Sequence, residues 1–146
     1  MLRGNLPVKV DDRGRLKLPQ PFKSIIVEQF GTALFVTSLN GESVRIYPLP
    51  IWVDIEKKLG KMPSTHPARI KFLSRANFHG QSTELDTQDR VLIHPRLRES
   101  AAMVGEVDVF GQYDYLEAWN HERYASKLKQ DPLTDTDLEA LAGYGI

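Results

Sequence analysis

The sequence predicts an α+β fold, mainly β with short helices, because one strand-like stretch occurs twice in the chain. The first repeat is residues 11–19, D-D-R-G-R-L-K-L-P, and a divergent second repeat is residues 86–95, D-T-Q-D-R-V-L-I-H-P. We expect each half to contain the same order of elements: a strand, a short helix, two strands and a longer helix. Self-similarity of this kind indicates two copies of one supersecondary unit.

Within the first repeat, apolar and basic residues alternate with the two-residue period of a β-strand. Leu16 and Leu18 are therefore expected to face inward, and Gly14 allows the tight bend before them. The carboxylate of Asp11 is expected to accept hydrogen bonds from backbone N–H groups of the turn and to reach Arg15 as well. The outward row of cations consists of Arg13, Arg15 and Lys17.

The other elements of the first half follow from start and stop signals. Proline residues end the first repeat, glycine ends the next helix, and Asn40-Gly41 is a hairpin signal. The expected elements are a strand over 5–10, a helix from Phe22 to Phe30, two strands within 33–47, and a helix from Pro50 to Leu59.

Residues 61–67, K-M-P-S-T-H-P, form the clearest break in the chain. We therefore expect one repeat unit over 1–62, a second over 63–130, and an acidic C-terminal tail over 131–146. The second unit should open with a helix over 68–78 that turns Ile70, Leu73 and Asn77 inward and exposes Arg69, Lys71 and Arg75. The tail should carry a short helix near 134–143. Its stripe Leu138, Leu141 and Tyr144 is expected to pack on its own chain, and the alternative is docking on a partner or a neighbouring subunit.

Composition excludes several classes of protein. The hydrophobic content of 41% and the charged content of 26% are those of a globular domain rather than a disordered chain. No apolar run reaches the length of a membrane span and the N-terminus lacks the apolar core of a signal peptide, so a cytoplasmic location is expected. The absence of cysteine excludes disulfides and thiolate metal sites.

Catalysis is not expected. The four histidines, His66, His79, His94 and His121, are scattered without metal-type spacing, and no nucleophile motif or phosphate-binding glycine loop occurs. We therefore expect no catalytic residue, no metal, no cofactor and no small-molecule substrate.

The net charge is zero, but its distribution is uneven. Residues 1–27 carry six cations against two acids, residues 61–75 carry four cations and no acid, and residues 131–146 carry four acids and no cation. The cations that precede the first repeat are Arg3 and Lys9. Because such fields are screened within roughly 8 to 10 Å, a neutral chain can still present a positive face to a polyanion.

The paired motifs D-D-R-G-R-L-K-L-P-Q-P-F-K and L-D-T-Q-D-R-V-L-I-H-P-R-L-R-E, with Y-P-L-P-I-W after the first hairpin, resemble the MraZ family over nearly all of residues 1–130. That family belongs to the broader AbrB and SpoVT class of DNA-binding domains. The resemblance implies two swapped-hairpin β units that form a pseudo-twofold barrel within one chain, and subunits that assemble into a ring. It also implies double-stranded DNA as the partner, at repeated operator elements ahead of the division and cell-wall gene cluster, including the protein's own promoter.

The family's D-x-x-x-R signature falls on Asp11 and Arg15, and again on Asp86 and Arg90. The second repeat departs from the pattern, since Asp89 replaces the glycine before the arginine and His94 replaces the first proline. Asp89 is expected to neutralise Arg90 and repel phosphate, so the first repeat should make the main contacts. The expected DNA-binding residues are Arg3, Lys9, Asp11, Arg13, Arg15, Lys17, Asp86 and Arg90.

The residues suggest a mechanism in which Arg15 contacts base or phosphate while Arg13 and Lys17 hold the backbone. Three cations per subunit are too few for tight binding, so a dimer or ring on several operator repeats would supply the remaining affinity. The alternative is an AbrB-like antitoxin that binds a toxin as well as DNA, with the tail as the docking segment. The operator sequence, the direction of regulation and the subunit number lie beyond the sequence.

Overall fold

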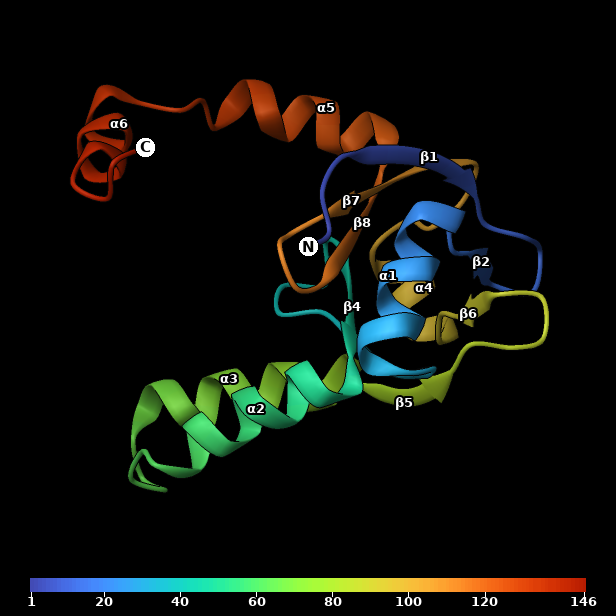
Figure 1. Cartoon of the computed structure of the whole chain (residues 1–146), viewed down its shortest axis with the longest axis horizontal. Coiled ribbons are helices and arrows are strands. Elements are labelled where there is room, and N and C mark those ends of the chain that lie inside the picture. Colours follow the sequence, from blue (N-terminus) through green and yellow to red (C-terminus); the bar gives the residue numbers. More distant parts are fainter.

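The computed structural model describes residues 1–146 as an open antiparallel sheet with several short helices, the α+β class that the sequence predicts (Figure 1). The six-stranded sheet has the order β1-β7-β8-β4-β3-β5, and β2 and β6 form a separate two-stranded sheet. The strands are β1 Asn5–Lys9, β2 Arg15–Lys17, β3 Ala33–Thr37, β4 Val44–Pro48, β5 Gln81–Glu84, β6 Arg90–Leu92, β7 Glu106–Gly111 and β8 Leu116–Asn120. The helices are α1 Gln20–Phe30, α2 Leu49–Gly60, α3 Pro67–His79, α4 Pro95–Ser100, α5 His121–Gln130 and α6 Asp135–Ala142.

The strands of the two halves are interleaved. The first strand of each half pairs with a strand of the other half: β1 with β7, and β5 with β3. The repeat strands β2 and β6 also pair with each other, and β4 pairs with β8 at the centre of the large sheet. Only the hairpins β3–β4 and β7–β8 stay within one half. Neither half can therefore complete its sheet without strands from the other.

The main core lies between the two-stranded sheet, the inner face of the large sheet, and helices α1 and α4. The inward side chains of β2 and β6, Leu16 and Val91, are fully buried, and so are Phe22 of α1 and Leu97 of α4. The predicted alternation in both repeats is confirmed, because Leu18 and Ile93 are buried while Lys17 and Leu92 are exposed. Burial of these apolar side chains fixes which face of the strand pair remains outside.

A second, aromatic cluster fastens the arm formed by α2 and α3 to the sheet, and it corrects the predicted inward face of α3. Trp52 of α2 stacks on Phe35 at a centroid distance of 4.6 Å and on Phe72 of α3 at 6.0 Å. Ala76 is fully buried, whereas Ile70 is 50% exposed and points away from the cluster. The inward face is thus set by stacking on Trp52, a long-range contact that helical periodicity within α3 does not contain.

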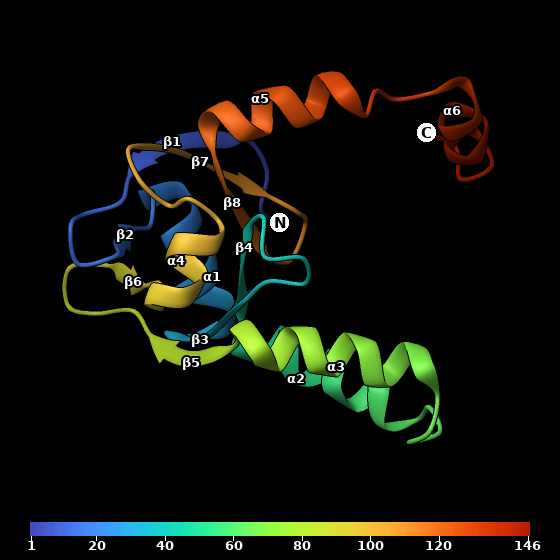
Figure 2. The ribbon, with the colours of Figure 1, turned by 180° about the vertical axis from the view of Figure 1, so that it is seen from behind.

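The C-terminal segment also differs from the expectation. Helix α6 begins with the predicted capping pattern, in which Thr134 and Asp137 bond each other reciprocally. It buries no side chain, however, and it lies away from the body beyond α5 (Figures 1 and 2). The expected packing of Leu138, Leu141 and Tyr144 on their own chain is therefore wrong, and Tyr144 is 84% exposed. No helix in the chain is both long and apolar enough to span a bilayer.

Candidate nucleic-acid interface

The loop between β1 and β2 is organised by one carboxylate, as predicted. The Oδ1 atom of Asp11 accepts hydrogen bonds from the backbone N–H groups of Arg13 at 3.0 Å and Arg15 at 2.8 Å. Its Oδ2 atom accepts the Nε–H of Arg15 at 2.7 Å. One side chain thereby closes the turn and holds the arginine that follows it. The contact uses Nε and leaves the two terminal nitrogens of the guanidinium to other partners.

The second repeat builds the same structure. Asp86 Oδ1 accepts the N–H groups of Gln88 at 2.8 Å and Arg90 at 2.9 Å, and its Oδ2 atom accepts Nε–H of Arg90 at 2.7 Å. The two aspartate–arginine units are therefore geometrically equivalent, although only four of the nine aligned residues, namely Asp86, Arg90, Val91 and Ile93, match the first repeat in kind. The D-x-x-x-R spacing is what the geometry requires, because it places the arginine on the strand that the aspartate turn begins.

Both carboxylates titrate below their ordinary range. The pKa of Asp11 is lowered chiefly by the hydrogen bond from the backbone N–H of Arg15; desolvation opposes this, and the Arg15 side chain and the backbone N–H of Arg13 lower the pKa further. The pKa of Asp86 is lowered by the corresponding bonds from Arg90 and Gln88. Each bond favours the charged carboxylate. The two turns are thus fixed by ionised groups at neutral pH.

Pairing of β2 with β6 merges the two repeats into one surface. In this antiparallel pair Arg15 lies opposite Leu92, Leu16 opposite Val91, and Lys17 opposite Arg90. Directly opposite residues share a face of the sheet. With Leu16 and Val91 buried, the outward face consists of Arg15, Lys17, Arg90 and Leu92, which we call the cationic face. The side chains of Arg15 and Arg90 are 27% and 24% exposed, and Lys17 is open to solvent.

The structure places Asp89 differently from the expectation. Arg90 pairs with Asp86, while the Asp89 carboxylate lies 3.7 Å from Nζ of Lys23 on α1. Asp89 takes the backbone conformation that Gly14 has in the first repeat, with φ of 60° against 78°. The predicted neutralisation of Arg90 by Asp89 is therefore not present, because this backbone conformation directs the carboxylate toward α1.

Two cations that the sequence did not single out lie beside the loops. Lys23 of α1 reaches the second-repeat loop, and Arg98 of α4 lies over Gly14 of the first-repeat loop. A Cβ atom at Gly14 would collide with the Arg98 guanidinium. The sequence contains one indication of these two cations: Phe22-Lys23 aligns with Leu97-Arg98, so each half carries a cation directly after a matched apolar residue.

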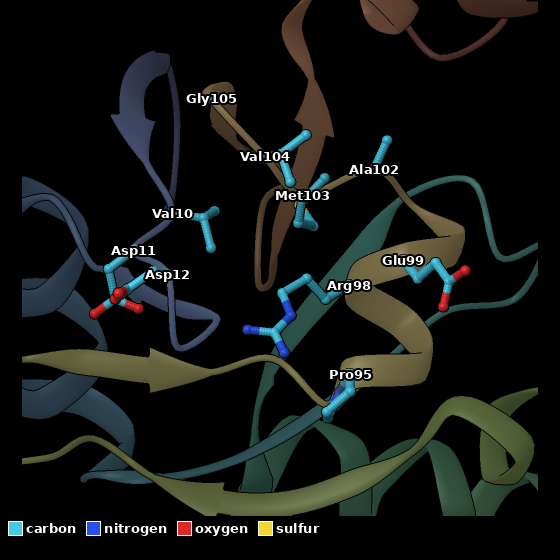
Figure 3. A pocket seen from close by; sticks show the side chains of 10 residues that line it. All are labelled: Val10, Asp11, Asp12, Pro95, Arg98, Glu99, Ala102, Met103, Val104 and Gly105. Atoms are coloured by element: carbon cyan, nitrogen blue, oxygen red, sulfur yellow. The ribbon is translucent and has the colours of Figure 1, made fainter.

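Arg98 also lines a pocket of about 760 Å³ between the β1–β2 loop, α4 and the segment before β7 (Figure 3). Its side chain extends from α4 toward Asp11 and Asp12. The pocket is open and carries carboxylates of both the loop and Glu99 on its rim. These carboxylates make the recess unfavourable for phosphate. The cationic face carries three cations and is the better surface for a polyanion.

The remaining predicted cations lie at opposite ends of β1. Lys9 is the last residue of β1, next to Val10, which forms a bridge with Leu16. Arg3 follows Leu2, which bridges Tyr113 in the β7–β8 turn at the other end of the strand. Six residues of extended chain span about 20 Å. The structure thus brings Lys9 to the same end of the molecule as the β1–β2 loop, and places Arg3 far from it.

His94 shows how the chain accommodates the second departure from the family pattern. Pro19 precedes α1, and His94 holds the same position before α4. The Nδ1 atom of His94 accepts the backbone N–H of Arg96 at 3.3 Å, so the imidazole caps the helix. The substitution keeps the helix start by a different means and puts a titratable ring at the loop.

Known proteins resemble this chain along its whole length. The model of the family described as "MraZ protein, putative antitoxin-like" matches residues 78–142. The Transcriptional regulator MraZ of Acidobacterium capsulatum is 48% identical over 146 residues, which cover all of both chains. The chain belongs to the MraZ family of transcriptional regulators.

Other MraZ proteins match along most of their length. The Transcriptional regulator MraZ of Koribacter versatilis is 43% identical over the whole of both chains. That of Escherichia coli O127:H6 is 31% identical over 97% of this chain and 91% of its own. The MraZ family assignment thus applies to both repeats and includes the C-terminal segment.

Proposed function

We propose that this MraZ-family chain is a sequence-specific regulator that contacts double-stranded DNA through its cationic face. The observation that carries the proposal is that Arg15, Lys17 and Arg90 share one outward face, with both arginines braced by an aspartate four residues earlier. A braced guanidinium loses less side-chain entropy on binding than a free one. Its terminal nitrogens are the donors that pair with guanine O6 and N7, or with phosphate.

A two-stranded antiparallel ribbon is one of the elements that fit the major groove of B-DNA. The β2–β6 pair has this form, and the β1–β2 and β5–β6 loops extend from it at the same end of the molecule (Figure 1). In this mode Arg15 reads a base edge or central phosphate, and Arg13 and Lys17 contact backbone phosphates. The first repeat makes most contacts because the second supplies only Arg90 to the face, beside the apolar Leu92.

The proposal includes the finer architecture of two swapped-hairpin units that form a pseudo-twofold barrel. Three observations support it. The strand order β1-β7-β8-β4-β3-β5 keeps its pairings when the halves are exchanged. The hydrogen bond from Leu18 N to Asp89 O, 2.9 Å, has its counterpart in that from Ile93 N to Gly14 O, 2.8 Å. The central pair Leu16 and Val91 lies on the axis that would relate the halves.

Affinity is proposed to come from several subunits acting together. One cationic face offers few phosphate contacts, and each contact weakens as salt rises. A ring of subunits on repeated operator elements, ahead of the division and cell-wall genes and within the protein's own promoter, would raise the effective concentration of each face. In this proposal the protein acts on nucleoid DNA in the cytoplasm.

The test is an Arg15→Ala variant with Lys57→Ala as its matched control, because Lys57 is an exposed lysine on α2. Affinity for DNA upstream of the gene is measured by fluorescence anisotropy, next to a scrambled duplex of equal length. We expect Arg15→Ala to lose operator binding while it still folds and melts cooperatively, and Lys57→Ala to bind as the wild type does. Operator affinity that survives Arg15→Ala would remove the cationic face from the function.

A second candidate, an antitoxin, is favoured by the wording of the matching family description and by the uncovered α6. Here the C-terminal segment would hold a toxin while the cationic face holds DNA. Purification of the untagged complex from the native host separates the two proposals. A small partner protein present in equal amount supports the antitoxin, and a preparation that contains the chain alone supports the regulator.

A further inference from the structure

Helix α6 is a formed helix with no partner on its own chain. It has eight residues, a reciprocal capping box, and no buried side chain. Isolated helices shorter than about 12 to 15 residues are marginal in water. Leu138 is half exposed, and Tyr144 and Ile146 after the helix are almost fully exposed. A helix so short requires a surface to cover its apolar side.

The charges of this segment restrict what that surface can be. Residues 131–146 carry Asp131, Asp135, Asp137 and Glu139 and no cation. A surface that attracts this segment must be basic and must offer apolar area between its cations.

Helix α3 has both properties. From residue 61 to residue 83 the chain has no acid. On the outer side of α3, Lys71 and Arg75 lie one turn apart and are exposed, and Phe78 continues the same face. Ile70 and Phe78 are 50% and 60% exposed, so α3 offers apolar area beside its cations. The outer face of α3 is thus complementary to α6 in both charge and apolar area.

The chain's own α5 also carries Lys127 and Lys129, but it does not cover α6, because α6 buries no side chain. In the first half, α3 covers a cluster built on Phe35, which lies opposite Tyr47. The corresponding position in the second half is Asp108, opposite Trp119, and the Asp108 carboxylate lies 2.9 Å from Nδ1 of His121 at the start of α5. The Asp108–His121 pair therefore occupies the position at which Phe35 supports α3 in the first half.

We propose that α6 of one subunit docks on the outer face of α3 of a neighbouring subunit. Helix α3 runs along one arm and α6 ends another, and both arms leave the body on the side away from the β2–β6 loops (Figures 1 and 2). Because the two contact surfaces differ, the contact is head-to-tail, and head-to-tail contacts generate closed rings or open filaments. The inference rests on the self-association included in the proposed function, and it identifies the surfaces that join the subunits.

Disulfide cross-linking tests the contact directly, because the natural chain contains no cysteine. Lys71→Cys and Glu139→Cys variants are purified separately, mixed, and oxidised. We expect a covalent dimer from the mixture and little from either variant alone. Lys57→Cys on α2 mixed with Glu139→Cys is the matched control. Cross-linking as efficient in the control as in the test pair would overturn the proposal.

Charge reversal supplies the second measurement. Lys71→Glu with Arg75→Glu, or Asp135→Lys with Glu139→Lys, should each weaken self-association by roughly tenfold, measured by analytical ultracentrifugation. Mixing the two reversed variants should restore assembly, because the charges are again complementary. Unchanged assembly in both variants, or no restoration on mixing, would contradict the inference.

The outcome is separable from that of DNA binding. The Arg15→Ala variant should cross-link between positions 71 and 139 as efficiently as the parent, because Arg15 lies on the cationic face and not on either arm. Failure of cross-linking with intact operator binding would remove this interface alone. Loss of operator binding in Arg15→Ala with intact cross-linking would confirm that the two surfaces act independently.

Discussion

Lys17 and Arg90 lie directly opposite each other across the β2–β6 pair, so residues from the two halves of the chain share one outward face. Neither strand exceeds three residues, and neither is stable alone. Each supplies the other's backbone partners and closes the core through Leu16 and Val91. The same pairing that stabilises the fold thereby assembles the cationic face.

The backbone conformation shared by Gly14 and Asp89 gives a matched pair of variants. Gly14→Ala places a Cβ in the left-handed region, which costs about 1–2 kcal/mol, and also displaces Arg98. Asp89→Gly relieves the same strain but adds freedom to the unfolded chain and removes the contact with Lys23, so its net effect should be close to zero. Urea denaturation measures both. Equal destabilisation by the two changes would contradict the assigned backbone conformations.

Acid should loosen the two turns. The pKa of Asp11 and the pKa of Asp86 are lower in the folded chain than in the unfolded chain. Their contribution to stability is therefore complete above the unfolded pKa of about 4 and is lost as pH falls through the folded pKa. The double variant Asp11→Asn, Asp86→Asn should be less stable than the wild type at pH 7.

The same double variant should lose less stability than the wild type as pH is lowered from about 5 to about 2, because its turns no longer depend on ionised carboxylates. Thermal melts across this pH range measure the difference. Asp12→Asn is the matched control, since Asp12 is an exposed aspartate in the same loop. Parallel pH curves for the double variant and the wild type would show that these carboxylates do not stabilise the folded state.

The local structure of the fold could be predicted from the sequence, but the pairing of distant strands could not. Turn chemistry at Asp11, alternation around Leu16, and helix stops at Gly31 and Gly60 are encoded by neighbours along the chain. Which strands pair between the two halves is decided by contacts between residues about 45 or more positions apart, such as Val36 with Gln81 and Leu16 with Val91. Single-chain periodicity cannot contain these, and the family resemblance supplied the expectation of swapped units instead.

The aromatic cluster shows the same limit on one helix. Trp52→Ala removes a ring that stacks on both Phe35 and Phe72, and we expect a loss of about 3–5 kcal/mol in the free energy of unfolding. Ile70→Ala, on the opposite side of α3, should change it by less than about 0.5 kcal/mol. Chemical denaturation distinguishes the two. A large loss for Ile70→Ala would restore the inward face that periodicity predicted.

The candidate site was predicted in part. Asp11, Arg15, Asp86 and Arg90 were identified from the repeated spacing, and the structure gives both pairs the same geometry. Lys23 and Arg98 were missed as neighbours of the loops, because each comes from a helix whose position depends on core packing. Arg3 was grouped with the first repeat by sequence proximity alone, and extended strand geometry carries it to the opposite end of β1.

Leu92 offers a gain of function on the cationic face. It lies opposite Arg15, is 52% exposed, and holds the position that corresponds to Lys17 in the first repeat. Leu92→Lys would give the second repeat a second cation on this face. Because each phosphate contact changes the slope of log K against log salt by roughly 0.9, we expect a slope steeper by about that amount.

Neutralising Arg13 and Lys17 together should flatten the slope by roughly 0.9 for each phosphate that the variant no longer binds. Anisotropy titrations from about 50 to about 200 mM salt measure both slopes, with Lys57→Ala as the control. If the slope is unaltered in Leu92→Lys and in the double neutralisation, the phosphates are bound by another surface of the molecule.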